Sequence, residues 1–219
     1  MPRLSTRSAL VCGSDAELTA VIALRLSATG IAVALLATAG ASASILAERT
    51  GLPVFSWDVG DYDACEQGIR QIQMHPRLGP LDILVNGAQV HQECPTAELT
   101  QPMWRNIIKV NLGGCFNLVK AVFPGMCERR FGRIITIAVA EEATGSLANR
   151  ATAAAVQGFT RALALEGRSA GVTANLIAHG RFVGSESMPG WQQDIADAVA
   201  LLCADASSGV TGSTLAIGS

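Results

Sequence analysis

The sequence predicts a single α/β domain in which helices cover both faces of a seven-stranded parallel sheet, the doubly wound Rossmann-like arrangement. Short, continuously apolar runs alternate along the chain with longer segments whose apolar residues recur at every third or fourth position. Apolar strands separated by helices are typical of a parallel sheet that is buried on both faces. The 219 residues suffice for one domain of ordinary size and contain no internal repeat or disordered linker. We therefore expect one domain over residues 1–219.

The first half of the chain supplies four expected strands. They are the apolar runs at 9–13, 31–36, 53–59 and 81–88. The second run lies inside residues 26–47, an uncharged stretch that is about long enough to span a bilayer. ATG before this run and TAGAS after it mark a helix end and a turn, so a strand is favoured over a membrane span. Helical spacing returns after the third strand, at Ile69, Ile72 and Met74.

The second half supplies the remaining strands, at 132–139, 171–178 and 213–218. Between the first two of these, Val156, Phe159 and Leu163 repeat at helical spacing, and about six helices are expected in all. In a doubly wound sheet, a ligand binds beyond the carboxyl ends of the strands, near the point where strand order reverses. The residues directly after each strand are therefore the candidates for a functional site.

The composition argues against several classes of partner. Charged residues make up 16% of the chain and the formal net charge is -2, so no strong field would gather nucleic acid or anionic lipid. We expect neither nucleic acid nor a membrane as a partner. The six cysteines lie more than ten residues apart, without CxxC or metal-knuckle spacing, and the first apolar run is too short for a secretory signal. We interpret them as buried thiols of a cytoplasmic protein.

Six segments of the sequence have the order and spacing of one known family. They are LDILVNGA, VNLGGCFNLVKAV, GRIITIA, GFTRALALE, GVTANLIAHG and DIADAVALLCADASSGVTGSTLAI. Together they resemble the short-chain dehydrogenase/reductase family, in particular its 3-oxoacyl-carrier-protein and acetoacetyl-CoA reductases, from Ala9 to Ser219. The resemblance implies a Rossmann fold, an NAD(P) cofactor and a carbonyl or hydroxyl substrate such as a 3-oxoacyl thioester. The function still has to be argued from the site.

The glycine-rich turn with which the family binds a dinucleotide is incomplete. The resemblance implies T-G-x-x-x-G-x-G at residues 12–19, and of these glycines only Gly13 is present. Asp15 and Glu17 would place negative charge beside a diphosphate, at a cost of about a kcal/mol or more each. Ser14 followed by Glu17 matches a capping box, which would satisfy the helix N–H groups with side chains. We favour a helix start closed by the protein itself, and we expect no cofactor.

Two other cofactor positions are ambiguous. Ala37 and Thr38 stand where the family places the acid or arginine that selects between NAD and NADP. Asp58 matches the aspartate that contacts the adenine, and it could equally cap a turn. Asn86 begins NGAQ, a permuted form of the family's N-N-A-G turn, and could instead stabilise the strand end. If NAD(P) binds, then Gly13, Asp58 and Asn86 are the remaining candidates to hold it.

The catalytic set of the family is mostly missing. Alignment without gaps on AVQGFTRALALE places Asn149 at the tyrosine and Ala153 at the lysine one helical turn later. The serine would fall at 138–140, which reads Ala-Val-Ala. Only Asn111, in KVNLGG, matches, and its backbone in the family helps to hold a water that leads to the lysine. Loss of a positioned proton donor costs about a hundredfold to ten-thousandfold in rate. The long substrate lid is also shortened, to about 181–190.

Polar residues still gather at the expected carboxyl edge of the sheet. They are Asn111, Glu141 or Glu142, Asn149 and His179. One interpretation makes His179 and Glu141 a new acid–base pair, and the other leaves these side chains solvated at a former site. We favour the second. The tryptophans are interpreted as packing residues rather than stacking platforms (Trp57, Trp104 and Trp191).

The helical segments around Asn111 and Asn149 resemble the two helices through which the family forms dimers and tetramers. Their small residues would let helices approach closely (Gly113, Gly114, Ala151, Ala153, Ala154 and Ala155). The preferred hypothesis is a pseudoenzyme that acts as a homo-oligomer or as a partner of an active homologue. The alternative is a divergent NAD(P)-dependent oxidoreductase. A third, weaker hypothesis is a module that binds a small molecule in the vacant crevice.

Overall fold

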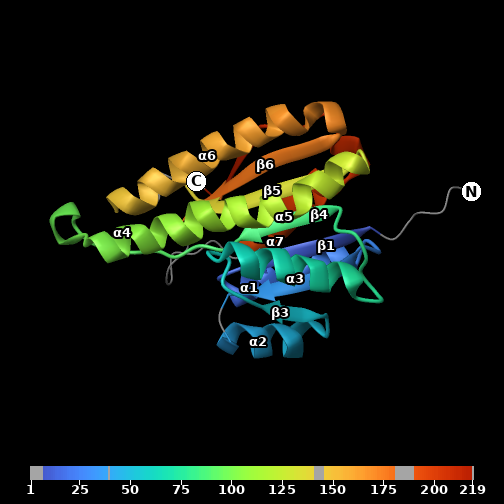
Figure 1. Ribbon diagram of the computed structural model, residues 1–219, viewed down its shortest axis with the longest axis horizontal. Helices are drawn as coiled ribbons and strands as arrows, with labels where there is room; N and C mark the ends of the chain where they lie inside the picture. The colour runs from blue at the N-terminus through green and yellow to red at the C-terminus, as the bar shows by residue number, and fades with distance from the viewer. Residues whose placement is uncertain (1–6, 39, 141–145, 181–189, 219) are drawn as a thin grey trace, which may run out of the picture.

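The computed structural model describes residues 7–38, 40–140, 146–180 and 190–218, and it confirms the predicted fold class (Figure 1). One parallel sheet has the strand order β3-β2-β1-β4-β5-β6-β7. The strands are β1 (Ser8–Gly13), β2 (Ala32–Ala37), β3 (Val54–Ser56), β4 (Ile83–Gly87), β5 (Gly132–Val139), β6 (Val172–His179) and β7 (Thr214–Ile217). Strand order reverses between β1 and β4, so the crevice expected in such a sheet opens at their carboxyl ends.

Apart from the third, the strands begin and end within one or two residues of the predicted runs. That run was expected to reach residue 59, whereas β3 ends at Ser56. The chain turns immediately afterwards, because the carboxylate of Asp58 accepts a hydrogen bond of 2.8 Å from the backbone N–H of Gly60. Residues 26–47, considered above as a membrane span, divide into the end of one helix, β2 and the start of another helix.

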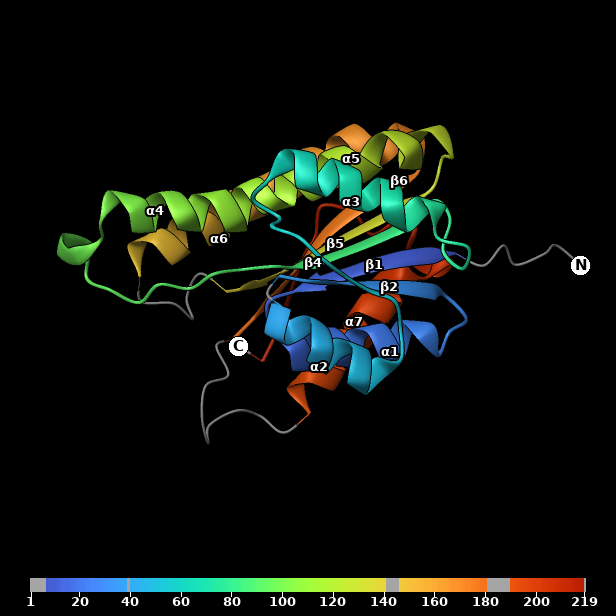
Figure 2. The ribbon, with the colours of Figure 1, turned by 60° about the horizontal axis from the view of Figure 1, so that its bottom comes forward.

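Helices cover both faces of the sheet. They are α1 (Ala16–Ser27), α2 (Gly40–Thr50), α3 (Tyr62–Met74), α4 (Gln101–Ile107), α5 (Gly114–Glu128), α6 (Leu147–Gly167) and α7 (Trp191–Cys203). Figure 2 shows α1, α2 and α7 on one face and α3, α5 and α6 on the other. Each face has its own core, built around Leu26 and Ile195 on the first and around Ile69 and Leu118 on the second. The two faces therefore bury the apolar strands that the sequence predicts.

The longest continuous helix runs from Gln101 to Glu128 and joins α4 to α5 through a π-helical turn at Ile108–Gly113. Within the described ranges it is the one helix whose length and composition would allow it to cross a membrane. Helices of a protein core meet the same criterion, and Leu118, Val122 and Met126 on α5 are buried in the second core. Packing inside the domain accounts for these apolar residues.

Candidate functional site

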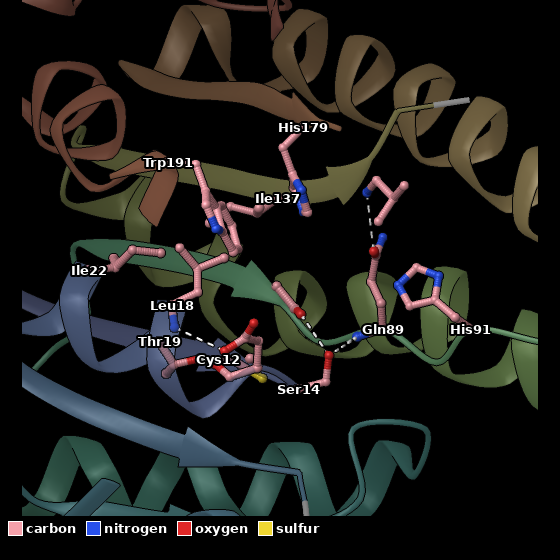
Figure 3. A pocket seen from close by; sticks show the side chains of 14 residues that line it. Cys12, Ser14, Leu18, Thr19, Ile22, Gln89, His91, Ile137, His179 and Trp191 are labelled. Carbon is pink, nitrogen blue, oxygen red and sulfur yellow. Dashed lines mark hydrogen bonds between the residues drawn. The ribbon is translucent and has the colours of Figure 1, made fainter. Parts of the chain in front are cut away.

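A cavity of about 310 Å³ opens at the carboxyl ends of β1, β4, β5 and β6, where the sheet topology places a ligand site (Figure 3). One wall is the start of α1, including Asp15 and Leu18. The opposite side carries Gln89 and His91 from the segment after β4. Trp191, the first residue of α7, closes the apolar end.

The first turn of α1 is closed by a side chain of the protein itself. The carboxylate of Asp15 accepts hydrogen bonds from the backbone N–H groups of Glu17, at 2.8 Å, and of Leu18, at 3.0 Å. The predicted capping box of Ser14 with Glu17 is wrong, because Asp15 is the N-cap. Ser14 instead contacts the chain after β4: its Oγ accepts a hydrogen bond of 3.3 Å from Gln89 N–H. Glu17 does not line the cavity, and its Oε1 lies 3.8 Å from Arg49 Nη2.

Gly13 lies close to Thr19 of α1. The Thr19 hydroxyl donates a hydrogen bond of 2.5 Å to the Asp15 carbonyl, and a Cβ on Gly13 would lie 2.1 Å from that hydroxyl oxygen. Thr19 stands where the resemblance implies the last glycine of the turn. Because Asp15 occupies the amides of Glu17 and Leu18, and Thr19 fills the place of the last glycine, the turn does not fit a dinucleotide diphosphate.

The other two cofactor candidates, Asp58 and Asn86, do not line this cavity. Asp58 forms an ion pair of 2.7 Å with Lys109 across a half-exposed surface, and this hydrogen bond to the Lys109 ammonium lowers the pKa of Asp58. Asn86 is buried: its amide donates to Cys115 Sγ at 3.0 Å and its oxygen accepts from Ala88 N–H at 3.1 Å. These contacts match the structural alternatives stated above, a turn cap for Asp58 and a strand end for Asn86.

Two buried asparagines fasten the segment after β4. Asn111 exchanges two hydrogen bonds with the backbone of Val90, at 2.8 Å and 3.0 Å. Asn149, at the position of the family tyrosine, does the same with Gln92, at 3.4 Å for each bond. Both asparagines are only 2–3% exposed, so the interpretation that they are solvated is wrong. Their side-chain amides instead form hydrogen bonds with backbone N–H and C=O groups of the segment after β4.

The backbone carbonyl of Asn111, which in the family helps to hold a water, is also engaged. The Cys115 thiol lies 3.1 Å from this oxygen and donates to it. Burial raises the pKa of Cys115 to about 12, so the thiol keeps its proton at neutral pH. The Asn111 amide additionally reaches the Thr152 hydroxyl at 3.4 Å. Asn111, which the resemblance implies as the one retained member of the catalytic set, is thus part of a buried hydrogen-bond network.

Alanines at the other catalytic positions line a second hollow, of about 220 Å³, between α6 and the ends of β5, β6 and β7. Ala153, at the lysine position, and Ala138 and Ala140, at the serine position, come together there as the resemblance implies. The polar side chains of the lining are Gln157 and Thr214, which bond to one another at 3.2 Å. Among the described residues that line this hollow, none can take up or release a proton near neutral pH.

His179 and Trp191 form the aromatic wall of the larger cavity. Their rings are stacked, with centroids 5.7 Å apart and planes at 21° (Figure 3). Nδ1 of His179 lies 2.7 Å from the Gly180 carbonyl oxygen and must therefore carry the proton. Burial lowers the pKa of His179 below its ordinary value, against smaller opposing effects of Gly180 and Asp15. Trp191 packs against the apolar core, as predicted for the tryptophans, and it also lines the cavity.

The structure does not describe some of the predicted site positions. Glu141, Glu142 and nearly all of the shortened lid at 181–190 lie outside the described residues. Sequence reasoning missed Trp191 and His91 as lining residues. Trp191 had a usable signal, since it begins the helix that follows the sixth strand, whereas His91 lies in a segment whose path the sequence does not define.

Comparisons with known proteins agree with the fold. Residues 7–194 match the family model described as short chain dehydrogenase. The chain is 35% identical over 234 residues to an acetoacetyl-CoA reductase of Shinella zoogloeoides, covering 96% of both proteins. It is 33% identical over 231 residues to the 3-oxoacyl-(acyl-carrier-protein) reductase of Escherichia coli (strain K12), covering 94% of this chain and 93% of the relative. A solved structure of a variant actinorhodin polyketide ketoreductase with NADPH is similar, with TM-score 0.85 and 26% identity over 100% of this chain and 98% of that one.

Proposed function

This chain belongs to the short-chain dehydrogenase/reductase family, as its sequence predicts, and we propose that it is a member without hydride-transfer activity. In this proposal it acts through association, either with further copies of itself or with an active homologue. A cytoplasmic location is part of the proposal, and the six free cysteines fit a reducing compartment.

The alanine-lined hollow is the observation that carries the proposal. The positions of the family lysine and serine meet there, and Ala153, Ala138 and Ala140 have no group that could orient or protonate a substrate oxygen. At the tyrosine position, the Asn149 amide is occupied by the backbone of Gln92. A proton donor alone contributes about 10² to 10⁴ in rate, and here the orienting and activating groups are absent with it.

We also propose that NAD(P) is not a cofactor of this chain. Asp15 occupies two amides at the start of α1 and brings a negative charge to the place where a diphosphate would lie. The NADPH belongs to the ketoreductase structure and supports cofactor use by that protein.

The outer surface of α5 and α6 is the proposed interface for association. Phe116 on α5 is 50% exposed and lines a shallow apolar hollow together with Phe123 and Phe159. Lys120 and Glu166 lie at the same hollow, so two copies related by a two-fold axis could pair opposite charges across it. One of the small residues expected at an interface has another role: a side chain on Gly114 would clash with Val59 of the same chain, at 2.9 Å.

Two measurements on purified protein test the proposal. Titration with NADPH, followed by nicotinamide fluorescence, is expected to give no micromolar binding, and addition of acetoacetyl-CoA to give no NADPH oxidation. Light scattering after gel filtration is expected to show an oligomer that Phe116→Glu dissociates. Ile45→Glu is the matched control, because Ile45 is similarly exposed, at 46%, on α2 at the opposite face. The proposed association would be contradicted if the wild type is a monomer and if pull-downs recover no homologous partner.

A divergent NAD(P)-dependent oxidoreductase is the second candidate. It is favoured by the similarity to two reductases over more than nine-tenths of the chain and by the retained Asn111. Its substrate would be a carbonyl or hydroxyl compound such as a 3-oxoacyl thioester. Micromolar binding of NADPH together with acetoacetyl-CoA-dependent oxidation would establish this candidate and overturn the first.

A further inference from the structure

A buried arginine at the amino end of the sheet lacks a carboxylate partner. Arg133, the second residue of β5, is 3% exposed, and none of the ion pairs between described residues includes it. A buried charge is costly unless it is paired and hydrogen-bonded. This end of the sheet lies opposite to the cavity, which opens at the carboxyl ends of the strands.

The donors that remain unused on Arg133 form one edge of its guanidinium group. Nη1 donates to the carbonyl oxygens of Gly132, at 2.9 Å, and of Gly171, at 3.4 Å. Nε is fully buried and has no hydrogen-bond partner. Nη2 makes no hydrogen bond to the described residues either, but it is not fully buried. Arginine uses this pair of N–H groups to bind a carboxylate or phosphate through two parallel hydrogen bonds, so the Nε–Nη2 edge has the form of an oxyanion site.

A second arginine adds positive charge at the same place. The guanidinium carbons of Arg133 and Arg7 lie 4.3 Å and 4.1 Å from the centre of the Phe131 ring. Arg7 in turn pairs with Asp205 at 2.5 Å. Burial and then repulsion by Arg7 lower the pKa of Arg133. An anion bound at Arg133 would relieve this repulsion.

The local charges favour a ligand with one negative charge. Arg7, Arg133 and Asp205 together leave an excess of one positive charge. Cys203, the last residue of α7, is near enough to affect the pKa of Arg133, but burial raises its own pKa to about 12, so the thiol is neutral at pH 7. A carboxylate brings one charge and two coplanar oxygens, whereas a phosphate monoester carries nearly two charges and presents three oxygens. The site therefore suits a carboxylate better than a phosphate.

We propose that the Nε–Nη2 edge of Arg133 binds the carboxylate of a small molecule, with Arg7 beside it as a second positive charge. The ligand is small because Arg133 is 3% exposed and meets solvent only through a narrow opening. The site lies at the opposite end of the sheet from the crevice and does not depend on whether the chain transfers hydride. The inference thus goes beyond the proposed function.

The Nε–H proton of Arg133 reports directly on the occupancy of the site. In the ¹⁵N-labelled full chain, titration with sodium acetate at constant ionic strength is expected to move this resonance downfield and to saturate, because the proton gains an acceptor. Sodium chloride over the same range is the control and is expected to leave the resonance in place. Arg133→Lys removes the resonance and so assigns it. No saturable shift with acetate, or the same shift with chloride, would overturn the inference.

Variants test the site by a second measurement, thermal unfolding in acetate and in chloride at equal ionic strength. The wild type is expected to unfold at a higher temperature in acetate, because the ligand binds the folded state. Arg133→Lys keeps the charge without the paired donors and is expected to lose this difference. Arg161→Lys, at an exposed position of α6, is the matched control and should retain it.

Asp205→Asn keeps the test decisive should the Arg133 variant fail to fold. Its side chain is 72% exposed, so the fold should tolerate the change. Removal of this carboxylate raises the local positive charge and is expected to tighten acetate binding by about threefold or more. Unchanged or weaker binding in this variant, or an unchanged acetate effect in folded Arg133→Lys, would overturn the inference. None of these results bears on the proposed function, which fails on NADPH-dependent reduction of acetoacetyl-CoA.

Discussion

The carboxamide of Asn149 forms a two-way hydrogen-bonded pair with the backbone of Gln92, accepting from its N–H and donating to its carbonyl oxygen. This pair joins α6 to the segment that follows β4 at the position of the family tyrosine. The residue at the position where the resemblance implies the tyrosine thus has a structural role of its own.

Replacing Asn149 by alanine is expected to destabilise the domain. Both backbone groups of Gln92 would lose a partner at a position where Asn149 is 3% exposed, so the free energy of unfolding should fall by about 1–3 kcal/mol. Urea denaturation followed by circular dichroism measures this change. Asn106→Ala, at an exposed position of α4, is the control and should change stability by less than about 0.5 kcal/mol. Equal changes in the free energy of unfolding for the two substitutions would show that the hydrogen bonds between Asn149 and Gln92 do not contribute to stability.

Restoring the tyrosine and lysine is not expected to restore reductase activity. In the double variant Asn149→Tyr, Ala153→Lys, the phenol must enter a buried position beside Gln92, the serine is still missing, and Asp15 still closes the nucleotide turn. Oxidation of NADPH with acetoacetyl-CoA should stay at the background rate. Ala153→Lys alone, at a half-buried position, should fold normally and serves as the control. Activity in the double variant would show that a competent cofactor site persists.

The fold was predictable because it depends on patterns that the sequence displays directly. Apolar runs separated by helical spacing determine which segments become buried strands, and the observed sheet contains all seven. The end of β3 was not predictable, because it depends on one hydrogen bond, which the backbone N–H of Gly60 donates to the Asp58 carboxylate. Boundaries set by single contacts leave little periodic signal.

The site was predictable as a location but not as a set of contacts. The positions of Ala138, Ala140 and Ala153 meet as the resemblance implies, and His179 lines the cavity at the carboxyl edge. Sequence could not decide whether Ser14 or Asp15 caps α1, since both residue types are good caps and adjacent. It also could not show which backbone groups the buried asparagines bond, because that depends on the path of a segment without regular structure.

The buried His179 is expected to make stability depend on pH. Its folded-state pKa lies below the ordinary value of about 6.5, so on acidification the unfolded chain takes up a proton before the folded protein does. Stability from this group is therefore complete above pH 7 and falls as the pH drops through 6.5. His179→Phe, which can still stack on Trp191, should lose less stability between pH 7 and pH 5 than the wild type. Thermal unfolding at both pH values measures this loss of stability. An equal loss in the variant and the wild type would show that His179 does not cause the pH dependence.

Gly13 and Thr19 are expected to be energetically coupled. Gly13 does not have a left-handed backbone, so Gly13→Ala is opposed only by the contact of 2.1 Å with the Thr19 hydroxyl, and it should cost about 1–3 kcal/mol. Thr19→Ala removes that hydroxyl and its bond to the Asp15 carbonyl, at about 0.5–1.5 kcal/mol. The clash is absent in the double variant. Its loss of unfolding free energy should therefore be smaller, by about 1 kcal/mol, than the sum of the losses in the two single variants. A double-mutant cycle by urea denaturation measures this difference. Losses that add to within about 0.5 kcal/mol would mean that the Thr19 side chain moves aside easily and that the close contact with Gly13 does not constrain the turn.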